Sequence, residues 1–203
     1  AGTGSLTPSH VAGSAPTITF TRSTVGWDFG SNGLLQSFAV DTPRFGYDQV
    51  TLAAKGLLIE PAATQLVTPT AAIRDMTDAS WVKVTMTTAK TATGADGAAN
   101  SATTLTAAGA NSTILQTLVA AATSRTNSAL VRRKTGTGTI LLKQGTATLD
   151  ITALINSTTY TLVQLNDNEL NVAFGFQINT NTDAIDVDFN QFEAGGIATS
   201  RMA

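Results

Sequence analysis

The sequence predicts an all-β protein, a two-layer antiparallel β-sandwich preceded by an extended N-terminal arm. Composition is the first indication: the chain holds 36 threonines and only three glutamates, and β-branched residues favour a pleated strand over a helix. The second is periodicity, because from residue 81 onward apolar and polar residues alternate in short segments separated by turn-forming residues. A chain of 203 residues suits one such core.

The first 70 residues are expected to be extended and irregular. Residues 1–16, AGTGSLTPSHVAGSAP, are small and polar, and we expect a flexible arm or one ordered only by a partner. All five prolines occur at or before Pro69. We therefore interpret residues 17–70 as an N-terminal attachment region that opens with one strand, TITFTRST. Within it GLLIEP, residues 56–61, has the apolar run of a strand buried on both faces.

Residues 71–203 are expected to form the sandwich itself, with eight or nine strands spaced as in other β-sandwiches. The predicted strands are WVKVTM, ATTLTA, STILQTLV, SALVRRK, TILLKQ, TATLDI, TYTLVQL, LNVAFGFQI and AIDVDFNQFE. Between SALVRRK and TILLKQ stands TGTG, residues 135–138, whose glycines can take the positive φ of a tight hairpin. We expect those two strands to pair.

Composition argues against several classes of function. Charged residues make up 13% of the chain and the formal net charge is -2, so no basic field is expected to attract nucleic acid. The apolar runs are too short for a membrane helix. There is no cysteine, and the single histidine, His10, falls in the arm. A Ser-His-Asp triad or a His/Cys metal site is therefore not expected, and we predict a protein that is not an enzyme and needs no cofactor.

Two aspartates in AIDVDFNQ form the most notable carboxylate pair. Asp186 and Asp188 are two residues apart on one predicted strand, so they share a face at about 7 Å, and Glu193 falls on the opposite face. We interpret the pair as solvated or hydrogen-bonded structure. A structural calcium site is the alternative, because carboxylate oxygens suit Ca²⁺, and glycoside cleavage by paired carboxylates is the weakest interpretation.

Glu60 stands where the GLLIEP strand ends, because Pro61 cannot donate to a ladder. A carboxylate in such a position commonly accepts backbone N–H groups of the following turn or pairs with an arginine. We therefore assign Glu60 as a structural carboxylate, with Arg22 or Arg44 as its partner.

Sugar binding needs an aromatic face and planar polar side chains. The candidate ligand-binding residues are Trp81, Tyr160 and Arg132. For Trp81, at the start of a strand, we favour packing in the core or at its rim over a ligand platform. Alternation sends Arg132 and Arg133 to opposite faces, so the two cannot line one surface. For the basic triplet 132–134 we favour a solvated strand edge whose charge prevents aggregation.

Five segments in order resemble a family of phage and prophage virion proteins, those with head-fibre, tail-fibre or decoration modules of a carbohydrate-binding-like jelly-roll type. The segments are TITFTRST, DTPRFGYDQVT, GLLIEPAATQL, DASWVKV and FNQFEAGGIATSRM. The resemblance runs over residues 16–202 and is weakest in the middle. The family's polar EARTN segment is replaced here by PAATQ, and its terminal Tyr-Ile-Pro by Arg201 and Met202. The resemblance implies a β-sandwich on a virion, with a binding or structural role and no catalysis.

The predicted function is a non-enzymatic virion structural protein, a capsid decoration, head-fibre or tail-fibre module on the exterior of the particle, assembled in the host cytoplasm. A carbohydrate-binding module for host or environmental glycans is the alternative, and a glycan depolymerase ranks last. The low charge and small-residue surface suit stacking against identical subunits, so we expect a homo-oligomer, with a trimer favoured, in contact with capsid or fibre subunits.

Overall fold

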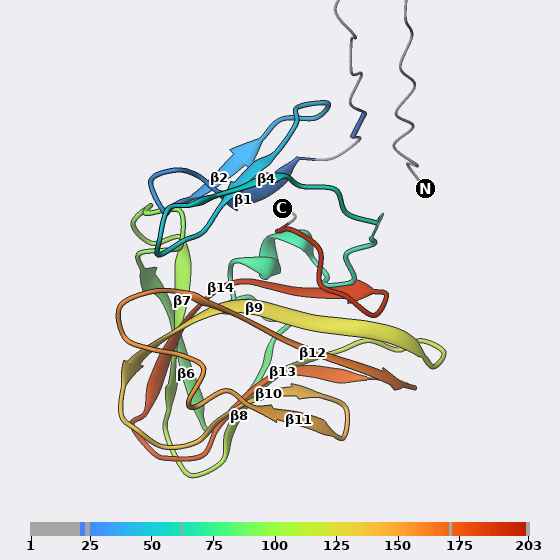
Figure 1. The fold of residues 1–203 in the computed structure, drawn as a ribbon. Helices are drawn as coiled ribbons and strands as arrows, with labels where there is room; N and C mark the ends of the chain where they lie inside the picture. The colour runs from blue at the N-terminus through green and yellow to red at the C-terminus, as the bar shows by residue number, and fades with distance from the viewer. Residues whose placement is uncertain (1–20, 23–24, 62, 171, 202–203) are drawn as a thin grey trace, which may run out of the picture. The chain divides into compact units, whose positions relative to one another are not determined.

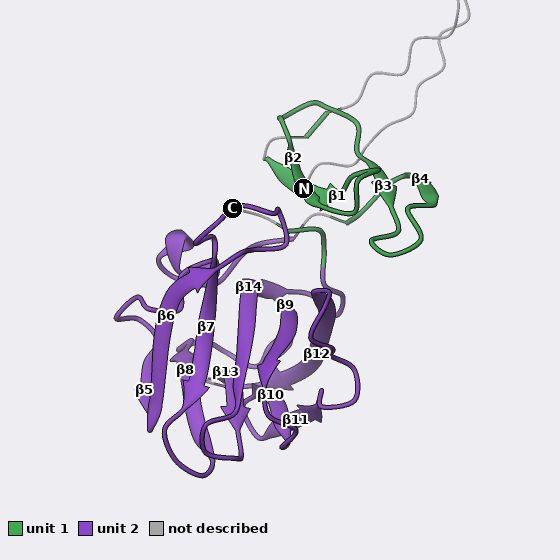
Figure 2. Cartoon of the chain, turned by 90° about the vertical axis from the view of Figure 1, so that its left-hand side faces the viewer, with its two compact units in different colours: residues 1–62, 199–202 green, residues 63–198, 203 purple. Residues whose placement is uncertain are grey.

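The computed structural model describes residues 21–22, 25–61, 63–170 and 172–201. The chain divides into two compact units, coloured separately in Figure 2: unit 1 is residues 1–62 with 199–202, and unit 2 is residues 63–198 with 203. The expected arm, residues 1–16, lies outside the described residues, and so does most of the predicted strand TITFTRST. In the described residues no helix is both long and apolar enough to span a bilayer.

Unit 2 is a two-layer antiparallel β-sandwich (Figure 1), which confirms the predicted fold class. Each layer is a five-stranded sheet, named here after its central strand. The β13 sheet has the order β11-β10-β13-β8-β5 and the β14 sheet the order β12-β9-β14-β7-β6. The strands are β5 (Val82–Val84), β6 (Met86–Ala92), β7 (Ala102–Ala107), β8 (Ser112–Thr117), β9 (Thr123–Thr135), β10 (Ile140–Gln144), β11 (Ala147–Asp150), β12 (Thr161–Glu169), β13 (Ala173–Ile178) and β14 (Ala184–Ala194).

The core lies between these two sheets. Phe174 of β13 stacks on Phe192 of β14 with ring centroids 4.0 Å apart, and Trp81 meets Phe174 edge-on at 5.6 Å. All three side chains are almost fully buried. Rings supplied from both layers interdigitate, as expected of a sandwich core.

The prediction that SALVRRK and TILLKQ form a hairpin is wrong. β9 pairs with β12 and β14, whereas β10 pairs with β11 and β13. The TGTG segment therefore crosses from one sheet to the other, and Gly136 takes a φ of 79° in that crossing. Glycine permits a positive φ both in a hairpin and in a connection between the two layers, so the TGTG motif did not distinguish a hairpin from a crossing.

A β-bulge changes which residues share a face on β14. The register with β9 shifts between Asp188 and Gln191, after which Glu193 lies opposite Thr126. Asp186 lies opposite Arg132. Arg132 and Thr126 are six residues apart on β9, an even number, so they share a face, and their partners Asp186 and Glu193 share that face too. The expectation that Glu193 would face the other way is wrong, because the bulge adds one residue to strict alternation.

The sandwich unit starts at Ala63, earlier than the boundary at residue 71 placed from the sequence. Gln65 forms an antiparallel bridge to Glu193, and the Leu66 N–H donates to the Phe192 carbonyl at 2.7 Å. A short 3₁₀ helix, η1 (Thr70–Ile73), follows and buries Ile73. Residues 63–73 thus belong to the sandwich because their backbone extends its hydrogen bonding.

Unit 1 contains two antiparallel strand pairs among its described residues. β1 (Gly26–Phe29) pairs with β2 (Leu35–Phe38), and β3 (Phe45–Tyr47) pairs with β4 (Ala54–Leu57). The prediction that GLLIEP is buried on both faces is wrong. Ile59 is 74% exposed and Leu57 38% exposed. An apolar run indicates burial only where other chain covers both faces, and β4 pairs with β3 alone.

Candidate functional site

The outer face of the β14 sheet carries a cluster of polar side chains, which we call the Arg132–Lys134 surface: Thr104, Arg132, Lys134, Tyr160 and Asp186. In the strand register Thr104 of β7 and Arg132 of β9 both lie opposite Asp186 of β14. Residues opposite one another in a ladder point to the same side of a sheet. The fold thus assembles the cluster from three strands that are far apart in sequence.

Hydrogen bonds fix each polar group in this cluster. The Arg132 Nη2 donates to Asp186 Oδ2 at 2.9 Å, and the Thr104 hydroxyl donates to Asp186 Oδ1 at 2.7 Å. Lys134 Nζ donates to Thr104 Oγ1 at 2.9 Å and lies 3.6 Å from Asp186 Oδ1. The Asp186 side chain is 4% exposed, whereas those of Arg132 and Lys134 are 25% and 44% exposed. The anion is covered and the two cations reach solvent.

Tyr160 supports the Arg132 side chain. The guanidinium carbon of Arg132 lies 4.8 Å from the centroid of the Tyr160 ring, a cation–π distance. The Tyr160 hydroxyl donates to the Thr93 carbonyl at 2.8 Å. Burial raises the pKa of Tyr160, against the opposing effect of Arg132. The phenol is therefore a neutral structural group that holds the arginine in place.

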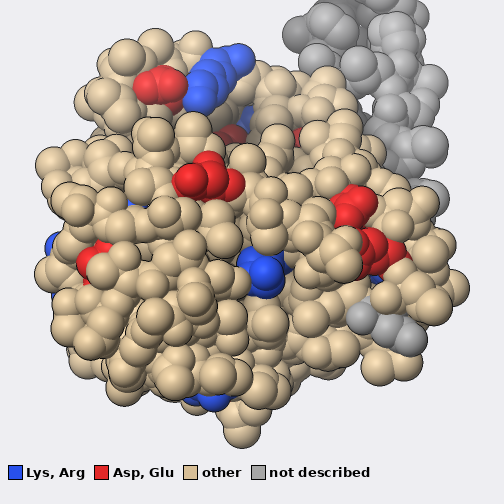
Figure 3. Space-filling view, turned by 90° about the horizontal axis from the view of Figure 1, so that it is seen from below, with Lys and Arg blue, Asp and Glu red and all other residues tan. Residues whose placement is uncertain are grey.

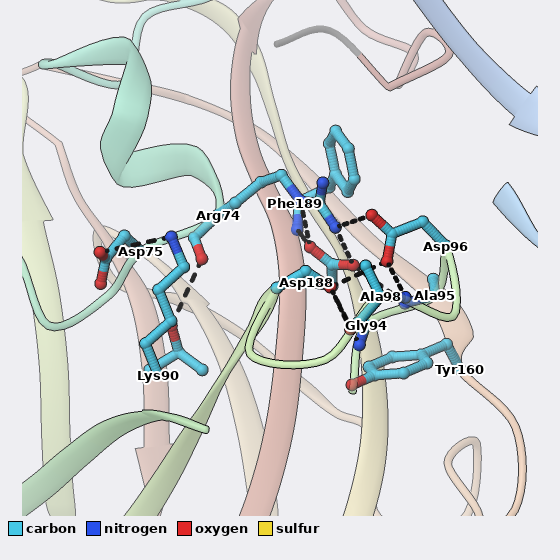
Figure 4. A network of polar contacts seen from close by, with 12 residues as sticks. Arg74, Asp75, Lys90, Gly94, Ala95, Asp96, Ala98, Tyr160, Asp188 and Phe189 are labelled. Atoms are coloured by element: carbon cyan, nitrogen blue, oxygen red, sulfur yellow. Dashed lines mark hydrogen bonds and ion pairs between the residues drawn. The ribbon is translucent and has the colours of Figure 1, made fainter. Parts of the chain in front are cut away.

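A second, closed cluster lies around Asp188 (Figure 4). Arg74 donates from Nε to Asp188 Oδ1 at 2.8 Å and from Nη2 to Asp96 Oδ2 at 2.7 Å. The Ala95 N–H donates to Asp188 Oδ2 at 3.0 Å, and the guanidinium of Arg74 lies 4.3 Å from the Phe189 ring centroid. Burial raises the pKa of Asp188, although Arg74 opposes this. This cluster fastens the 93–98 turn over the sheet.

Asp186 and Asp188 do share a face, but they are not solvated. Both are buried, and an arginine binds each. Within the described ranges, no group of three or more His, Cys, Asp or Glu side chains could hold a metal ion. The carboxylate oxygens face cationic and N–H donors, an arrangement suited to ion pairs.

Trp81 does not present a face to a ligand, so its assignment as a binding residue is wrong. The side chain is 1% exposed and its indole N–H donates to the Ala72 carbonyl at 3.1 Å. The same holds across unit 2, whose six aromatic side chains are all buried: Trp81, Tyr160, Phe174, Phe176, Phe189 and Phe192. Burial of these rings removes their large apolar area from water, which stabilises the fold and leaves no aromatic face of unit 2 exposed to a ligand.

The interpretation of residues 132–134 as a strand edge is also wrong. β9 lies between β12 and β14, so it is an interior strand. Arg132 and Arg133 do point to opposite faces: Arg132 reaches Asp186, whereas Arg133 donates to the Gly136 and Gly138 carbonyls. The signal that sequence reasoning missed is Lys134. It lies two residues after Arg132, and strand alternation alone would predict that the two share a face. In the structure the register with β14 shifts at Lys134, and its Nζ still reaches Asp186 beside Arg132.

Glu60 lies in unit 1 and contacts Arg44. The Arg44 Nη2 donates to Glu60 Oε2 at 2.8 Å, and the Ser200 N–H donates to Glu60 Oε1 at 2.6 Å. The side chains are 7% and 18% exposed for Arg44 and Glu60. Arg22 instead donates to the Phe38 carbonyl. The backbone donor comes from the C-terminal segment of unit 1, which local sequence could not indicate.

Comparison with known proteins gives one likeness of fold. No family model matches the chain, and no curated protein matches its sequence. Among solved structures, the chain is similar to the CBM22-1 xylan-binding domain of Xyn10C from Paenibacillus barcinonensis, with a TM-score of 0.44 and 13% identity over 58% of this chain and 87% of that domain. Such a likeness says nothing about the ligand of this chain.

Proposed function

We propose that the chain is a non-enzymatic carbohydrate-binding module that holds its glycan on the Arg132–Lys134 surface. The observation that carries this proposal is the pair of partly exposed cationic side chains, Arg132 and Lys134, held in place over the buried carboxylate of Asp186. Donors that are already oriented lose little conformational freedom on binding, so hydroxyl or charged groups of a sugar chain can be bound without rearrangement.

The state of the carboxylates supports binding without cleavage. Glycoside hydrolysis needs one protonated carboxyl and one ionised carboxylate, both in reach of the scissile bond. Asp186 and Asp188 are each buried against an arginine. Neither is presented to a bound substrate, so we expect a bound polysaccharide to remain intact.

Affinity electrophoresis of the full chain in gels containing neutral and acidic polysaccharides tests the proposal. We expect at least one polymer to retard the protein, and we expect Lys134→Ala to reduce the retardation. Lys143→Ala is the matched control, because Lys143 is a half-buried lysine on a middle strand of the β13 sheet. Absence of retardation by every polymer, or equal effects of the two substitutions, would contradict the proposal.

A second candidate function, attachment of the module to a larger assembly such as a virion, is favoured by the surface of unit 1. Large apolar side chains lie exposed on the β3–β4 pair and its connections: Phe45 53%, Val50 73%, Leu52 46% and Ile59 74%. Exposed apolar patches commonly become buried in protein interfaces. We propose that copies of unit 1 associate through these side chains, with a trimer as the favoured form.

Light scattering on the purified full chain tests the second candidate. We expect a mass above that of the 20.9 kDa protomer, and a lower mass for the double variant Val50→Ser with Ile59→Ser. Val119→Ser is the matched control, since Val119 is 80% exposed on the sandwich unit. A monomer at all concentrations would exclude self-association through unit 1.

A further inference from the structure

We infer that the Arg132–Lys134 surface selects acidic polysaccharides by binding a monoanionic group, a uronate carboxylate. This inference rests on the proposed glycan-binding function and names its ligand class. The face shown in Figure 3 carries only small, separate patches of charge. The whole chain has 12 Lys and Arg against 14 Asp and Glu, so recognition of an anion depends on a local group of residues and not on a general basic field.

The local balance of charge at this surface is positive. Arg132 and Lys134 both lie within 4 Å of Asp186, so two cations share one carboxylate. The neighbouring Asp188 and Asp96 share Arg74. That cluster therefore has one more carboxylate than cations, but Asp188 within it is fully buried and accepts from the Ala95 N–H, so the positive excess at the surface belongs to Arg132 and Lys134. Asp186 is almost fully buried beneath the two cations, which brings the positive groups, and not the negative one, to the solvent.

Donor capacity remains on both cations. Among the described residues, Arg132 donates to Asp186 through Nη2, which leaves its Nε and Nη1 groups for a ligand. The Tyr160 ring and Asp186 together hold the guanidinium plane, and a fixed planar fork suits the two oxygens of a carboxylate. Lys134 has three ammonium protons and donates one to Thr104, so it can add a second contact.

The surroundings favour an anionic over a neutral sugar. Binding of a neutral sugar commonly uses an aromatic ring against its C–H groups, and all six aromatic side chains of unit 2 are buried. On β6, Ala89 lies opposite Thr104 and Thr87 lies opposite Thr106, and both of these small side chains are exposed. Such a surface offers steric access but little stacking area, so charge-assisted hydrogen bonds must supply most of the affinity.

The test compares two polymers that share a backbone and differ in charge, and adds a polyanion of different chemistry. Affinity electrophoresis of the full chain would use polygalacturonate, its fully methyl-esterified form and poly(glycerol phosphate). We expect polygalacturonate to bind about 10-fold more tightly than the methyl ester, and to lose affinity as ionic strength rises from about 20 to 500 mM. Binding of poly(glycerol phosphate) that also depends on Lys134 would support anion recognition and identify phosphate as a second source of the anion.

Substitutions locate the effect. Lys134→Ala is expected to weaken binding to polygalacturonate about 10-fold, with Lys143→Ala unchanged. Arg132→Ala removes the arginine that binds the buried Asp186 carboxylate, so the folding of this variant is checked first by circular dichroism. If the Arg132→Ala variant does not fold, the test rests on Lys134→Ala. Equal affinity for the charged and esterified polymers would overturn this inference while leaving glycan binding intact. Failure to bind any neutral or acidic polymer would overturn the proposed function as well.

Discussion

The ion pairs of Arg74 with Asp188 and Asp96 show how burial decides the contribution of an ion pair to stability. Asp188 is completely buried, and Arg74 bridges it to Asp96. Burial alone would lower the pKa of Arg74, but the two carboxylates raise it. Lys90 and Asp75 also form a pair of opposite charges, with Lys90 Nζ 3.4 Å from Asp75 Oδ2, but their side chains are 36% and 29% exposed. Water screens the attraction between Lys90 and Asp75, whereas it cannot reach Asp188 to solvate the carboxylate in place of Arg74.

Arg74→Ala is therefore expected to lower the free energy of unfolding by about 3–5 kcal/mol, since it leaves the Asp188 carboxylate buried without its cation. Lys90→Ala is the matched control and should cost less than about 1 kcal/mol. Urea unfolding followed by tryptophan fluorescence measures both. Similar losses for the two variants would show that the Arg74 cluster is not a buried ion pair in solution.

Asp48 gives a prediction about pH. Hydrogen bonds from the Thr51 and Val50 N–H groups, then the Thr51 hydroxyl, lower its pKa from 3.8 to about 2. Because the folded pKa is below the unfolded value, its contribution to stability is present above pH 3.8 and is lost as the pH falls towards 2. An NMR titration of the Asp48 carboxyl should give a midpoint near 2. A midpoint near 3.8 would mean that these hydrogen bonds do not form.

Single residues were predictable from the sequence where strand alternation alone decides. The opposite orientations of Arg132 and Arg133 follow from it, and so does the shared face of Asp186 and Asp188. The partners of these residues were not predictable. Arg132 and Asp186 are 54 positions apart, and only the pairing of β9 with β14 brings them together.

At the scale of elements, most strands of unit 2 were predictable because alternation and turn residues mark them, whereas their pairing was not. TGTG fits a hairpin and a crossing between layers equally well by local chemistry. The bulge on β14 also leaves no signal that alternation can detect, and it decides the face of Glu193. Pairing is set by the fit of two layers around Phe174 and Phe192, a property that no local window contains.

Gly175 gives a prediction about the β13 sheet. Its φ is 142°, and a Cβ built there would lie 2.1 Å from the Ile114 carbonyl oxygen of β8. Both the backbone strain and the steric contact oppose a side chain, so Gly175→Ala should cost about 2–5 kcal/mol. At Gly109 the nearest contact is an ordinary 3.4 Å, so Gly109→Ala should change stability by less than about 1 kcal/mol. Thermal unfolding that ranks the two equally would contradict the register of β8 and β13.

At the scale of the whole molecule, the chain forms two units where the sequence predicted one sandwich with an attached region. The change in proline content near residue 69 pointed to a boundary, and the observed boundary is at residue 62. That residues 199–202 belong to unit 1 was not predictable, since it depends on contacts such as Ser200 with Glu60 across 140 positions.

Glu60→Gln tests this division. The substitution removes the charge that binds Arg44 and weakens acceptance from the Ser200 N–H. Amide hydrogen exchange of the full chain should accelerate in unit 1, in β1 to β4, and stay unchanged in β9, β13 and β14, because separately packed regions open as separate cooperative units. Uniform acceleration over both units would indicate a single cooperative body.

The most direct test of the central claim, that this sandwich binds an acidic glycan on the outer face of the β14 sheet, is NMR mapping of the full chain titrated with a galacturonate oligomer. We predict that the perturbed amides cluster on β6, β7 and β9 around Arg132 and Lys134, and that the oligomer remains uncleaved. Perturbations confined to the β13 sheet or to unit 1, or their absence at saturating oligomer, would contradict the claim.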